Sequence, residues 1–193
     1  MARSIRRCDW CGDDPLYVAY HDEEWGLPRR DEDVLFEFLL LEGAQAGLSW
    51  ITILRKRENY RQAMDGFDAS AIARYDKRRV EKLLRNEGII RNRLKIESAI
   101  NNARRYLEFA ERGESFSEFI WSFTDGRSIQ NRFKSIAEVP ATTQVSDAMS
   151  KALKKKGFNF VGSTICYAYM QSIGMVNDHL TSCFRHKECR TAQ

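Results

Sequence analysis

The chain has 193 residues and a formal net charge of +4 at pH 7, with 43% hydrophobic and 30% charged residues. This composition is typical of a soluble globular protein, and we expect a single domain over residues 1–193 with a full hydrophobic core. The sequence contains no apolar stretch long enough to span a membrane and no apolar segment of a secretion signal. We therefore expect a cytoplasmic location, and the odd number of five cysteines argues against a disulfide framework.

Apolar residues recur at helical spacing along the chain, and no segment alternates convincingly as a β-strand would. The stretch from Val34 to Glu42 is apolar nearly all round, which predicts a helix buried at the centre of the fold. Ser146 is the expected N-cap of a helix that reaches Lys156 and stops at Gly157. Further helices are expected over residues 80–84 (ending near Glu87-Gly88), 96–107, 116–123 and 161–172 (closed by Gly174). The sequence predicts an all-α fold.

Glu42 ends the most apolar of these helices, and a buried carboxylate is costly unless a cation or several hydrogen-bond donors pair with it. Two nearby glycines allow close backbone approach, and Trp50 follows them. Aromatic residues of the opening segment could complete a pocket for a flat, cationic or donor-rich ligand such as a modified base: Trp10, Tyr17, Tyr20 and Trp25. The alternative is an ordinary core in which Glu42 pairs with an arginine, and the spacing by itself favours that alternative.

The junction between the last two predicted helices is a candidate phosphate site. Residues 152–164 read A-L-K-K-K-G-F-N-F-V-G-S-T, a basic helix end, a glycine-bearing turn and a new helix start. A helix N-terminus presents free backbone N–H groups to an anion. Basic clusters at 91–95 and 104–105 are further candidates for nucleic-acid binding. A plain turn between packed helices, and solvated helix faces for the basic clusters, are the alternatives.

Cysteine and histidine residues gather near both ends of the chain. His179 and Cys183 are four residues apart and would face the same side of a helical turn. Zinc prefers four nitrogen or sulfur ligands, so these two could form half of a site that joins residues 1–25 to residues 175–193. The other half could be Cys8 with Cys11, or either cysteine with His21, and the spacing does not choose between them. Unconnected cysteines and histidines are the alternative.

Five long sequence blocks carry a resemblance to a known family. They are D-P-L-Y-V-A-Y-H-D-E-E-W-G, L-E-G-A-Q-A-G-L-S-W, G-I-I-R-N-R-L-K-I, K-K-K-G-F-N-F-V-G-S-T-I-C-Y-A-Y and G-M-V-N-D-H-L-T-S-C. From about Cys8 to Cys183 the chain resembles the bacterial 3-methyladenine DNA glycosylase I family, a member of the helix-hairpin-helix glycosylase superfamily. The resemblance implies hydrolytic excision of 3-methyladenine from double-stranded DNA, leaving an abasic site, and we expect the protein to act as a monomer.

The resemblance also implies roles for individual residues. A structural Zn²⁺ ion would be held by Cys8, His21, His179 and Cys183, which leaves Cys11 without a ligand role. The base would be recognised by Glu42 with aromatic side chains around it: Tyr20, Trp50, Tyr17 and Trp10. Ala44 stands where we expect the family to carry a glutamine more often, so a contact from that side chain is not expected here.

For DNA binding, the resemblance implies that Leu48, after Gly47, enters the duplex in place of the flipped base. The hairpin residues expected to grip phosphate are Lys156, Gly157, Gly162, Ser163 and Thr164. A 3-methylated adenine is cationic in DNA and leaves easily, so the enzyme need not protonate it, and Asp178 is a less favoured catalytic candidate. Two alternatives are a glycosylase with lyase activity on another damaged base, for which no lysine is evident, and a zinc-stabilised DNA-binding module without catalysis.

Overall fold

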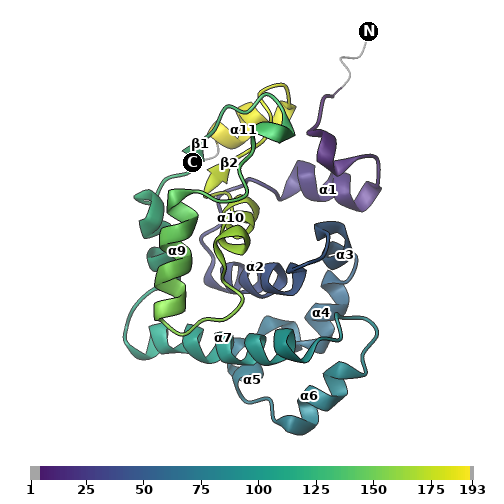
Figure 1. The fold of residues 1–193 in the computed structure, drawn as a ribbon, viewed down its shortest axis with the longest axis vertical. Coiled ribbons are helices and arrows are strands. Elements are labelled where there is room, and N and C mark those ends of the chain that lie inside the picture. The colour runs from purple at the N-terminus through teal and green to yellow at the C-terminus, as the bar shows by residue number, and fades with distance from the viewer. Residues whose placement is uncertain (1–4, 192–193) are drawn as a thin grey trace.

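The computed structural model describes residues 5–191, and helices account for most of its regular structure (Figure 1). The α-helices are α1 (Pro15–Glu23), α2 (Glu32–Gln45), α3 (Trp50–Leu54), α4 (Arg57–Ala63), α5 (Ala69–Ala73), α6 (Lys77–Leu84), α7 (Arg93–Glu111), α8 (Phe116–Trp121), α9 (Gln144–Lys155), α10 (Ser163–Ser172) and α11 (Phe184–Thr191). Single 3-10 turns are η1 (Asp9–Cys11), η2 (Asp65–Phe67), η3 (Ser122–Thr124) and η4 (Ile136–Glu138). The strands β1 (Ile129–Gln130) and β2 (Val176–Asn177) form one short parallel pair, the exception to the predicted all-α fold.

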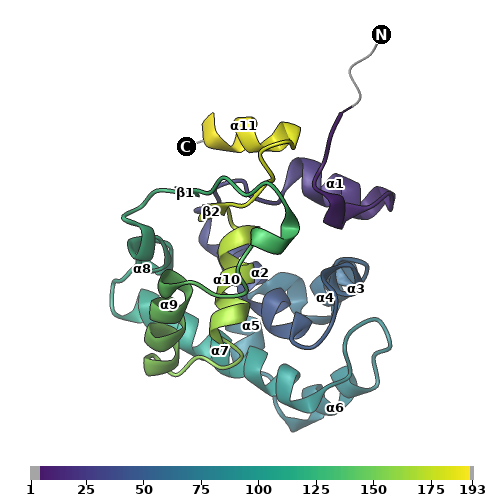
Figure 2. The same ribbon diagram turned by 45° about the horizontal axis from the view of Figure 1, so that its top comes forward.

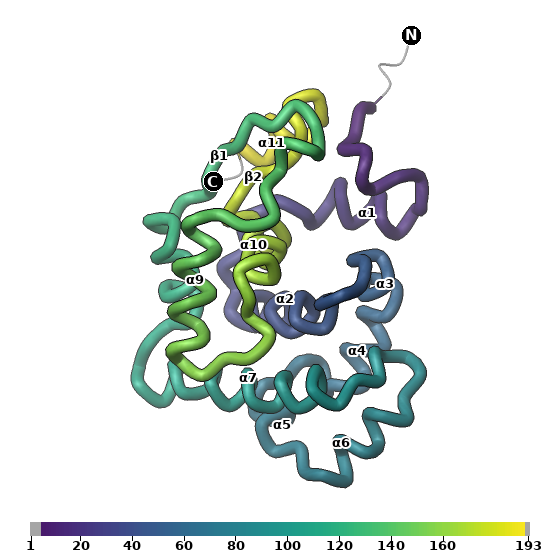
Figure 3. Tube along the Cα trace, in the orientation of Figure 1, coloured from purple at the N-terminus to yellow at the C-terminus, as the bar shows by residue number. Residues whose placement is uncertain are grey.

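Helix α2 lies at the centre, where it packs against α7, α10, α3 and α8 (Figure 1). Its side chains Leu35, Phe36 and Leu41 are almost completely buried, which confirms the predicted central helix. Helices α9 and α10 form a hairpin, and the trace runs down α9, turns and returns along α10 (Figure 3). Helices α1 and α11, from the two ends of the chain, lie at the same end of the molecule (Figure 2). No helix within residues 5–191 is both long and apolar enough to cross a bilayer.

Helix α9 begins one turn earlier than predicted. Its N-cap is Thr143, whose side chain accepts a hydrogen bond from the Ser146 backbone N–H at 3.2 Å. The Ser146 hydroxyl in turn accepts from the Thr143 N–H at 2.8 Å. Ser146 is therefore the third residue of a reciprocal capping box rather than the N-cap, because the two side chains satisfy each other's backbone donors.

The predicted helix end at Gly88 is also wrong. Helix α6 ends at Leu84, and Gly88 does not adopt a left-handed conformation. A Cβ atom at Gly88 would lie 3.0 Å from the Asn59 side chain, so the glycine permits close packing rather than a helix stop. Gly157 and Gly174 do have the left-handed φ values expected of residues after a helix, at +87° and +71°.

Gly174 gives a direct test of how the end of α10 packs. A Cβ atom there would lie 2.2 Å from the Leu27 carbonyl carbon, in addition to the strain of a positive φ. We expect Gly174→Ala to lower the free energy of unfolding by about 3 kcal/mol or more, measured by urea denaturation. Gly113→Ala is the matched control, since Gly113 has a φ of +68° but nothing within 4 Å, and its expected cost is about 1 kcal/mol. Equal costs at the two positions would contradict the close approach.

Candidate active site and metal centre

A cavity of about 180 Å³ lies between the N-terminal segment, α2 and α10. Its volume is several times the ~30 Å³ that one water molecule occupies in the liquid, so a flat heterocycle can be accommodated. The residues that line it come from six separate parts of the chain: Trp10, Tyr17, Tyr20, Trp25, Glu42, Gln45, Trp50, Ile136, Val139, Ala168, Gln171 and Asp178. All five residues predicted to recognise a base are among them.

Aromatic rings form most of the pocket wall. The ring centroids of Tyr20 and Trp50 are 5.3 Å apart, and those of Trp10 and Tyr17 are 4.9 Å apart. Trp25 packs edge-on against Trp10 with a centroid distance of 4.9 Å. Tyr20 and Trp50 are only 3% and 9% exposed, so their positions are fixed by packing before any ligand binds. Fixed aromatic faces of this kind can stack on a flat base and attract positive charge.

Glu42 brings a carboxyl group into this apolar setting. Its side chain is 3% exposed, and Oε2 has no hydrogen-bond partner within residues 5–191. Burial raises the pKa of Glu42 to about 8, an effect that the Ser172 hydroxyl only partly offsets. No ion pair joins Glu42 to a basic side chain of the described chain, so the alternative of an arginine partner is wrong. A cationic ligand with N–H donors would supply the missing partner.

The sequence did not identify several residues of the pocket wall. Ala168 and Gln171 lie three residues apart on α10 and face the same side, a spacing that could have indicated a shared surface. Ile136 and Val139 belong to the irregular segment after β1, where no periodicity gave a signal. Asp178, considered only as a minor catalytic candidate, lies in the wall directly after β2.

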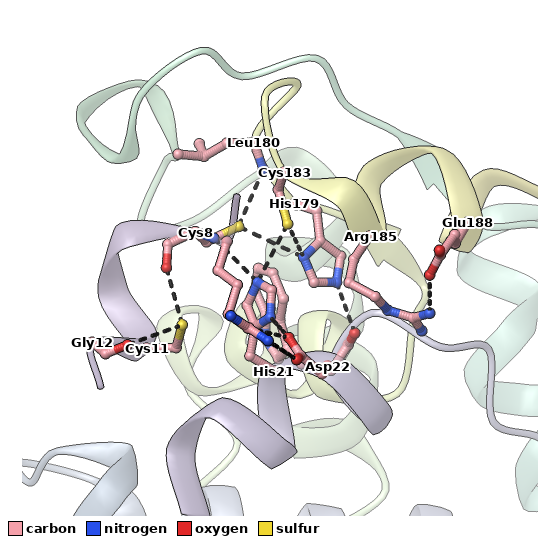
Figure 4. A network of polar contacts seen from close by, with 12 residues as sticks. Cys8, Cys11, Gly12, His21, Asp22, His179, Leu180, Cys183, Arg185 and Glu188 are labelled. Atoms are coloured by element: carbon pink, nitrogen blue, oxygen red, sulfur yellow. Dashed lines mark hydrogen bonds and ion pairs between the residues drawn. The ribbon is translucent and has the colours of Figure 1, made fainter. Parts of the chain in front are cut away.

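Beside the pocket, four side chains converge from the two ends of the chain (Figure 4). The possible ligand atoms of Cys8, His21, His179 and Cys183 all lie within 4.8 Å of one another, and all four residues are buried. The Cys183 sulfur is 3.5 Å from His21 Nε2 and 3.6 Å from His179 Nδ1, and the Cys8 sulfur is 3.6 Å from His179 Nδ1. With zinc bond lengths of about 2.3 Å to sulfur and 2.0–2.1 Å to nitrogen, a tetrahedral site has sulfur–nitrogen edges of about 3.6 Å. These side chains fit a metal ion.

Neighbouring groups orient the two imidazole rings. His21 Nδ1 lies 2.7 Å from Asp22 Oδ1, and Asp22 is held by the Arg7 guanidinium at 2.7 Å. His179 Nε2 lies 2.9 Å from the Trp25 carbonyl oxygen. Each ring thus turns its other nitrogen toward the two sulfurs, an arrangement typical of histidine ligands.

The pKa values of the two cysteine thiols in this cluster are shifted in opposite directions. A hydrogen bond from Cys8 lowers the pKa of the Cys183 thiol, and contacts with His179 and His21 lower it further. The hydrogen bond to Cys183 raises the pKa of Cys8 in turn. A thiolate, the form that ligates metals, is therefore already favoured at Cys183.

Cys11 lies outside this cluster. Its sulfur donates a hydrogen bond to the Cys8 carbonyl oxygen at 3.1 Å. The sulfur points away from the four possible metal ligands of the cluster (Figure 4). Burial raises the pKa of its thiol. Of the ligand sets that the spacing left open, the structure brings together the one with Cys8 and His21.

The predicted DNA-inserting loop follows α2. Gly47 has a φ of +76°, and Leu48 is 41% exposed. Lys95, at the start of α7, holds this loop, because its ammonium group donates to the carbonyl oxygens of Ala44 at 2.8 Å and Ala46 at 2.7 Å. Lys95 was predicted only as part of a basic cluster, so its role in capping the C-terminal end of α2 was missed.

The hairpin between α9 and α10 has an open helix N-terminus. No side chain caps α10 at Gly162, Thr164 is exposed, and the Ser163 hydroxyl lies 2.8 Å from that of Ser146. The Lys156 ammonium, however, is 3.2 Å from a Glu114 oxygen and 4.4 Å from the centroid of the Phe109 ring. Lys156 is thus engaged within the fold, and the exposed neighbours Lys154 and Lys155 are better placed to meet solvent.

The other basic clusters serve the fold. Arg93 pairs with Glu81 at 2.5 Å, and Arg91 pairs with Glu87 at 3.3 Å. Arg104 donates to the Ala73 carbonyl oxygen at 3.0 Å. The alternative of ordinary surface contacts accounts for these arginines.

The fold and pocket define a mostly helical protein in which a helical hairpin accompanies an aromatic cavity large enough for a flat heterocycle. The sequence model of the methyladenine glycosylase family matches residues 10–186, and the chain belongs to this family. The resemblance inferred from the sequence is confirmed.

Individual relatives agree over nearly their whole length. The chain is 51% identical over 179 residues to DNA-3-methyladenine glycosylase 1 of Escherichia coli (strain K12), covering 93% of this chain and 96% of that protein. It is 49% identical to DNA-3-methyladenine glycosylase of Haemophilus influenzae, covering 96% and 98%. A crystal structure of 3-methyladenine DNA glycosylase I matches with a TM-score of 0.92 and 55% identity, covering 93% and 98%. The enzyme from Staphylococcus aureus, solved to explain 3-methyladenine recognition, matches with a TM-score of 0.89 and 32% identity, covering 94% and 97%.

Proposed function

We propose that this protein is a monofunctional DNA glycosylase that removes 3-methyladenine from alkylated double-stranded DNA. It hydrolyses the N-glycosidic bond and leaves an abasic site. The observation that carries this proposal is the buried Glu42 carboxyl group, whose Oε2 has no hydrogen-bond partner within residues 5–191 and which lies among aromatic rings. Relatives named for 3-methyladenine excision support the same substrate, as does a related enzyme in complex with 3-methyladenine.

The pocket suits the electronic character of this base. A 3-methylated adenine in DNA is cationic, so its glycosidic bond is weakened and the base leaves as a neutral molecule. Glu42 accepts hydrogen bonds from the exocyclic amine and attracts the cation, while Tyr20 and Trp50 stack on the ring and Trp10 and Tyr17 complete the wall. Extruding the nucleotide costs a few kcal/mol, and less for a damaged base, which favours the alkylated site.

DNA is held on either side of the pocket. Leu48, presented after Gly47, fills the gap left by the extruded base. The free N-terminus of α10 at Gly162, Ser163 and Thr164 binds a backbone phosphate, since it carries no side-chain cap. Lys156 and the left-handed Gly157 form the turn between α9 and α10. The exposed Lys154 and Lys155 add positive charge beside it.

A structural Zn²⁺ ion is proposed at Cys8, His21, His179 and Cys183, on the basis of the tetrahedral edge lengths of the cluster. When bound, the ion would join the N-terminal segment that carries Cys8 and His21 to the C-terminal segment that carries His179 and Cys183. The aromatic residues between Cys8 and His21 would then be held against the pocket. We also propose that the chain forms a single domain and acts as a monomer in the cytoplasm.

Two alternatives differ in chemistry. A glycosylase with lyase activity needs an amine nucleophile, and no lysine lines the pocket within the described chain. A non-catalytic zinc-stabilised module would not need an unpaired buried carboxyl group. Simple hydrolysis is therefore favoured.

The test incubates the protein with methylated duplex DNA and identifies released bases by chromatography. We expect free 3-methyladenine and abasic sites without strand cleavage. DNA binding without base release would indicate the non-catalytic module. Strand cleavage with a borohydride-trapped protein–DNA adduct would indicate the lyase.

A further inference from the structure

Asp178 is a buried acid with three hydrogen-bond donors. Its side chain is 2% exposed. Asn131 Nδ2 donates to Oδ1 at 2.6 Å, while the Tyr167 hydroxyl and Gln171 Nε2 donate to Oδ2 at 2.7 Å and 2.8 Å. These donors come from the segment after β1 and from α10, so the carboxylate joins two walls of the pocket. Three donors offset the cost of burying the charge.

This arrangement fixes which way the Gln171 amide points. A carboxylate oxygen only accepts hydrogen bonds, so the amide nitrogen must face Asp178 and the amide oxygen must point elsewhere. The Gln171 backbone is also fixed, because its carbonyl oxygen accepts from the Gly26 N–H at 3.1 Å. Gln171 Oε1 has no hydrogen-bond partner in residues 5–191 and is not fully buried. It is therefore an accessible acceptor on a residue that lines the pocket.

Gln171 lines the same cavity as the proposed base-recognising acid. Ser172, its neighbour in the chain, has its hydroxyl against Glu42, and α10 packs on α2. Glu42, with its carboxyl group, and Gln171, with its unpaired amide oxygen, are thus two acceptor-bearing residues that line one cavity. An exocyclic amine carries two N–H groups and can donate to both. An exocyclic oxygen carries none and would face two acceptors.

We propose that Gln171 is a second base-recognising residue that selects 6-amino over 6-oxo purines, and that Asp178 is the positioning residue that sets its amide. This inference rests on the proposed function and adds a determinant of its specificity. In this arrangement Gln171 Oε1 accepts a hydrogen bond from the exocyclic amine of the 3-methylated adenine. The 6-oxo counterpart, 3-methylguanine, would leave that acceptor unpaired, and a site with an unpaired buried polar group rejects such a ligand.

The test measures the ratio of 3-methyladenine to 3-methylguanine released from the same methylated duplex DNA in one reaction. Because both bases compete for the same enzyme, the ratio does not depend on the fraction of folded protein. We expect Gln171→Met to lower this ratio about tenfold, the effect of losing one hydrogen bond. Asp178→Asn should also lower this ratio. A neutral amide at position 178 can donate as well as accept, so the Gln171 amide could flip and exchange the positions of its nitrogen and oxygen. Gln62→Met, at an exposed position on α4, is the matched control and should leave the ratio unchanged.

Each outcome has one meaning. If the unmodified protein releases no 3-methyladenine, the proposed function itself fails. If it does release 3-methyladenine but Gln171→Met lowers both bases equally, Gln171 has only a structural role and the inference is overturned. If Gln171→Met does not fold, Asp178→Asn decides, and an unchanged ratio in that variant overturns the inference. Tryptophan fluorescence titration with the two free bases gives an independent check, since Trp10, Trp25 and Trp50 line the cavity.

Discussion

Glu42→Gln is expected to lower the rate of 3-methyladenine excision by about 100-fold or more while the protein stays folded. The raised pKa favours the neutral acid in the free protein, whereas contact with a cationic base favours the carboxylate, and a glutamine of the same shape cannot ionise to supply that negative charge. Because the group is 3% exposed, little solvent screens that charge. The measurement is a single-turnover assay with methylated duplex DNA, which separates the chemical step from product release.

The matched control is Glu58→Gln on α4, which removes a carboxylate whose side chain is 67% exposed. This variant should excise the base at the rate of the unmodified protein. Excision that is equally fast in Glu42→Gln would remove Glu42 from its role in base recognition.

The same substitution should stabilise the protein in a pH-dependent way. Burial raises the pKa of Glu42 from 4.5 to about 8, so the folded protein binds a proton there that the unfolded chain has lost between these values. The contribution of Glu42 to stability is therefore largest below about pH 4.5 and falls as the pH rises to about 8, by at most about 5 kcal/mol. We expect Glu42→Gln to be more stable than the unmodified protein at pH 8 and to lose that advantage near pH 5. A stability difference that does not change with pH would contradict the raised pKa.

Cys8→Ser is expected to abolish zinc binding and to lower the free energy of unfolding by about 3 kcal/mol or more. Loss of one of four ligands opens the site, and the remaining three come from segments that only the fold brings together. Metal content is measured by atomic emission on the purified protein and stability by urea denaturation. Removal of the ion from the unmodified protein with a chelator should lower stability in the same way.

Cys11→Ser is the control for this experiment. Cys11 is also buried, but its sulfur donates to the backbone carbonyl oxygens of Cys8 at 3.1 Å and Gly12 at 3.9 Å, contacts of a kind that a serine hydroxyl can also make. This variant should retain about one zinc ion per chain. Loss of zinc from Cys11→Ser together with its retention in Cys8→Ser would reassign the ligand.

Local sequence patterns predicted much of the fold because helices depend on near neighbours. The apolar stretch before Glu42 marked the buried helix α2, and the glycines at 157 and 174 marked helix ends. The start of α9 was predicted less accurately than these helix ends. Thr143 and Ser146 are both good capping residues, and only their mutual hydrogen bonds show which of them is the N-cap. The predicted helix end at Gly88 was wrong for a similar reason. The Asn59 side chain on α4, distant in sequence, leaves little room for a Cβ atom at position 88.

The sequence by itself determined the helical class, the family and the residue types of the two sites. Tertiary structure decided which groups meet: the contact between Cys8 and His179 spans 171 positions, and Lys95 reaches Ala44 across 51. It also decided that Glu42 has no basic partner within residues 5–191, that Lys156 is bound to Glu114 and that Asp178 fixes the Gln171 amide. Helical periodicity reports only which face of a segment is apolar, whereas the pairing of polar groups depends on distances between segments that fold together.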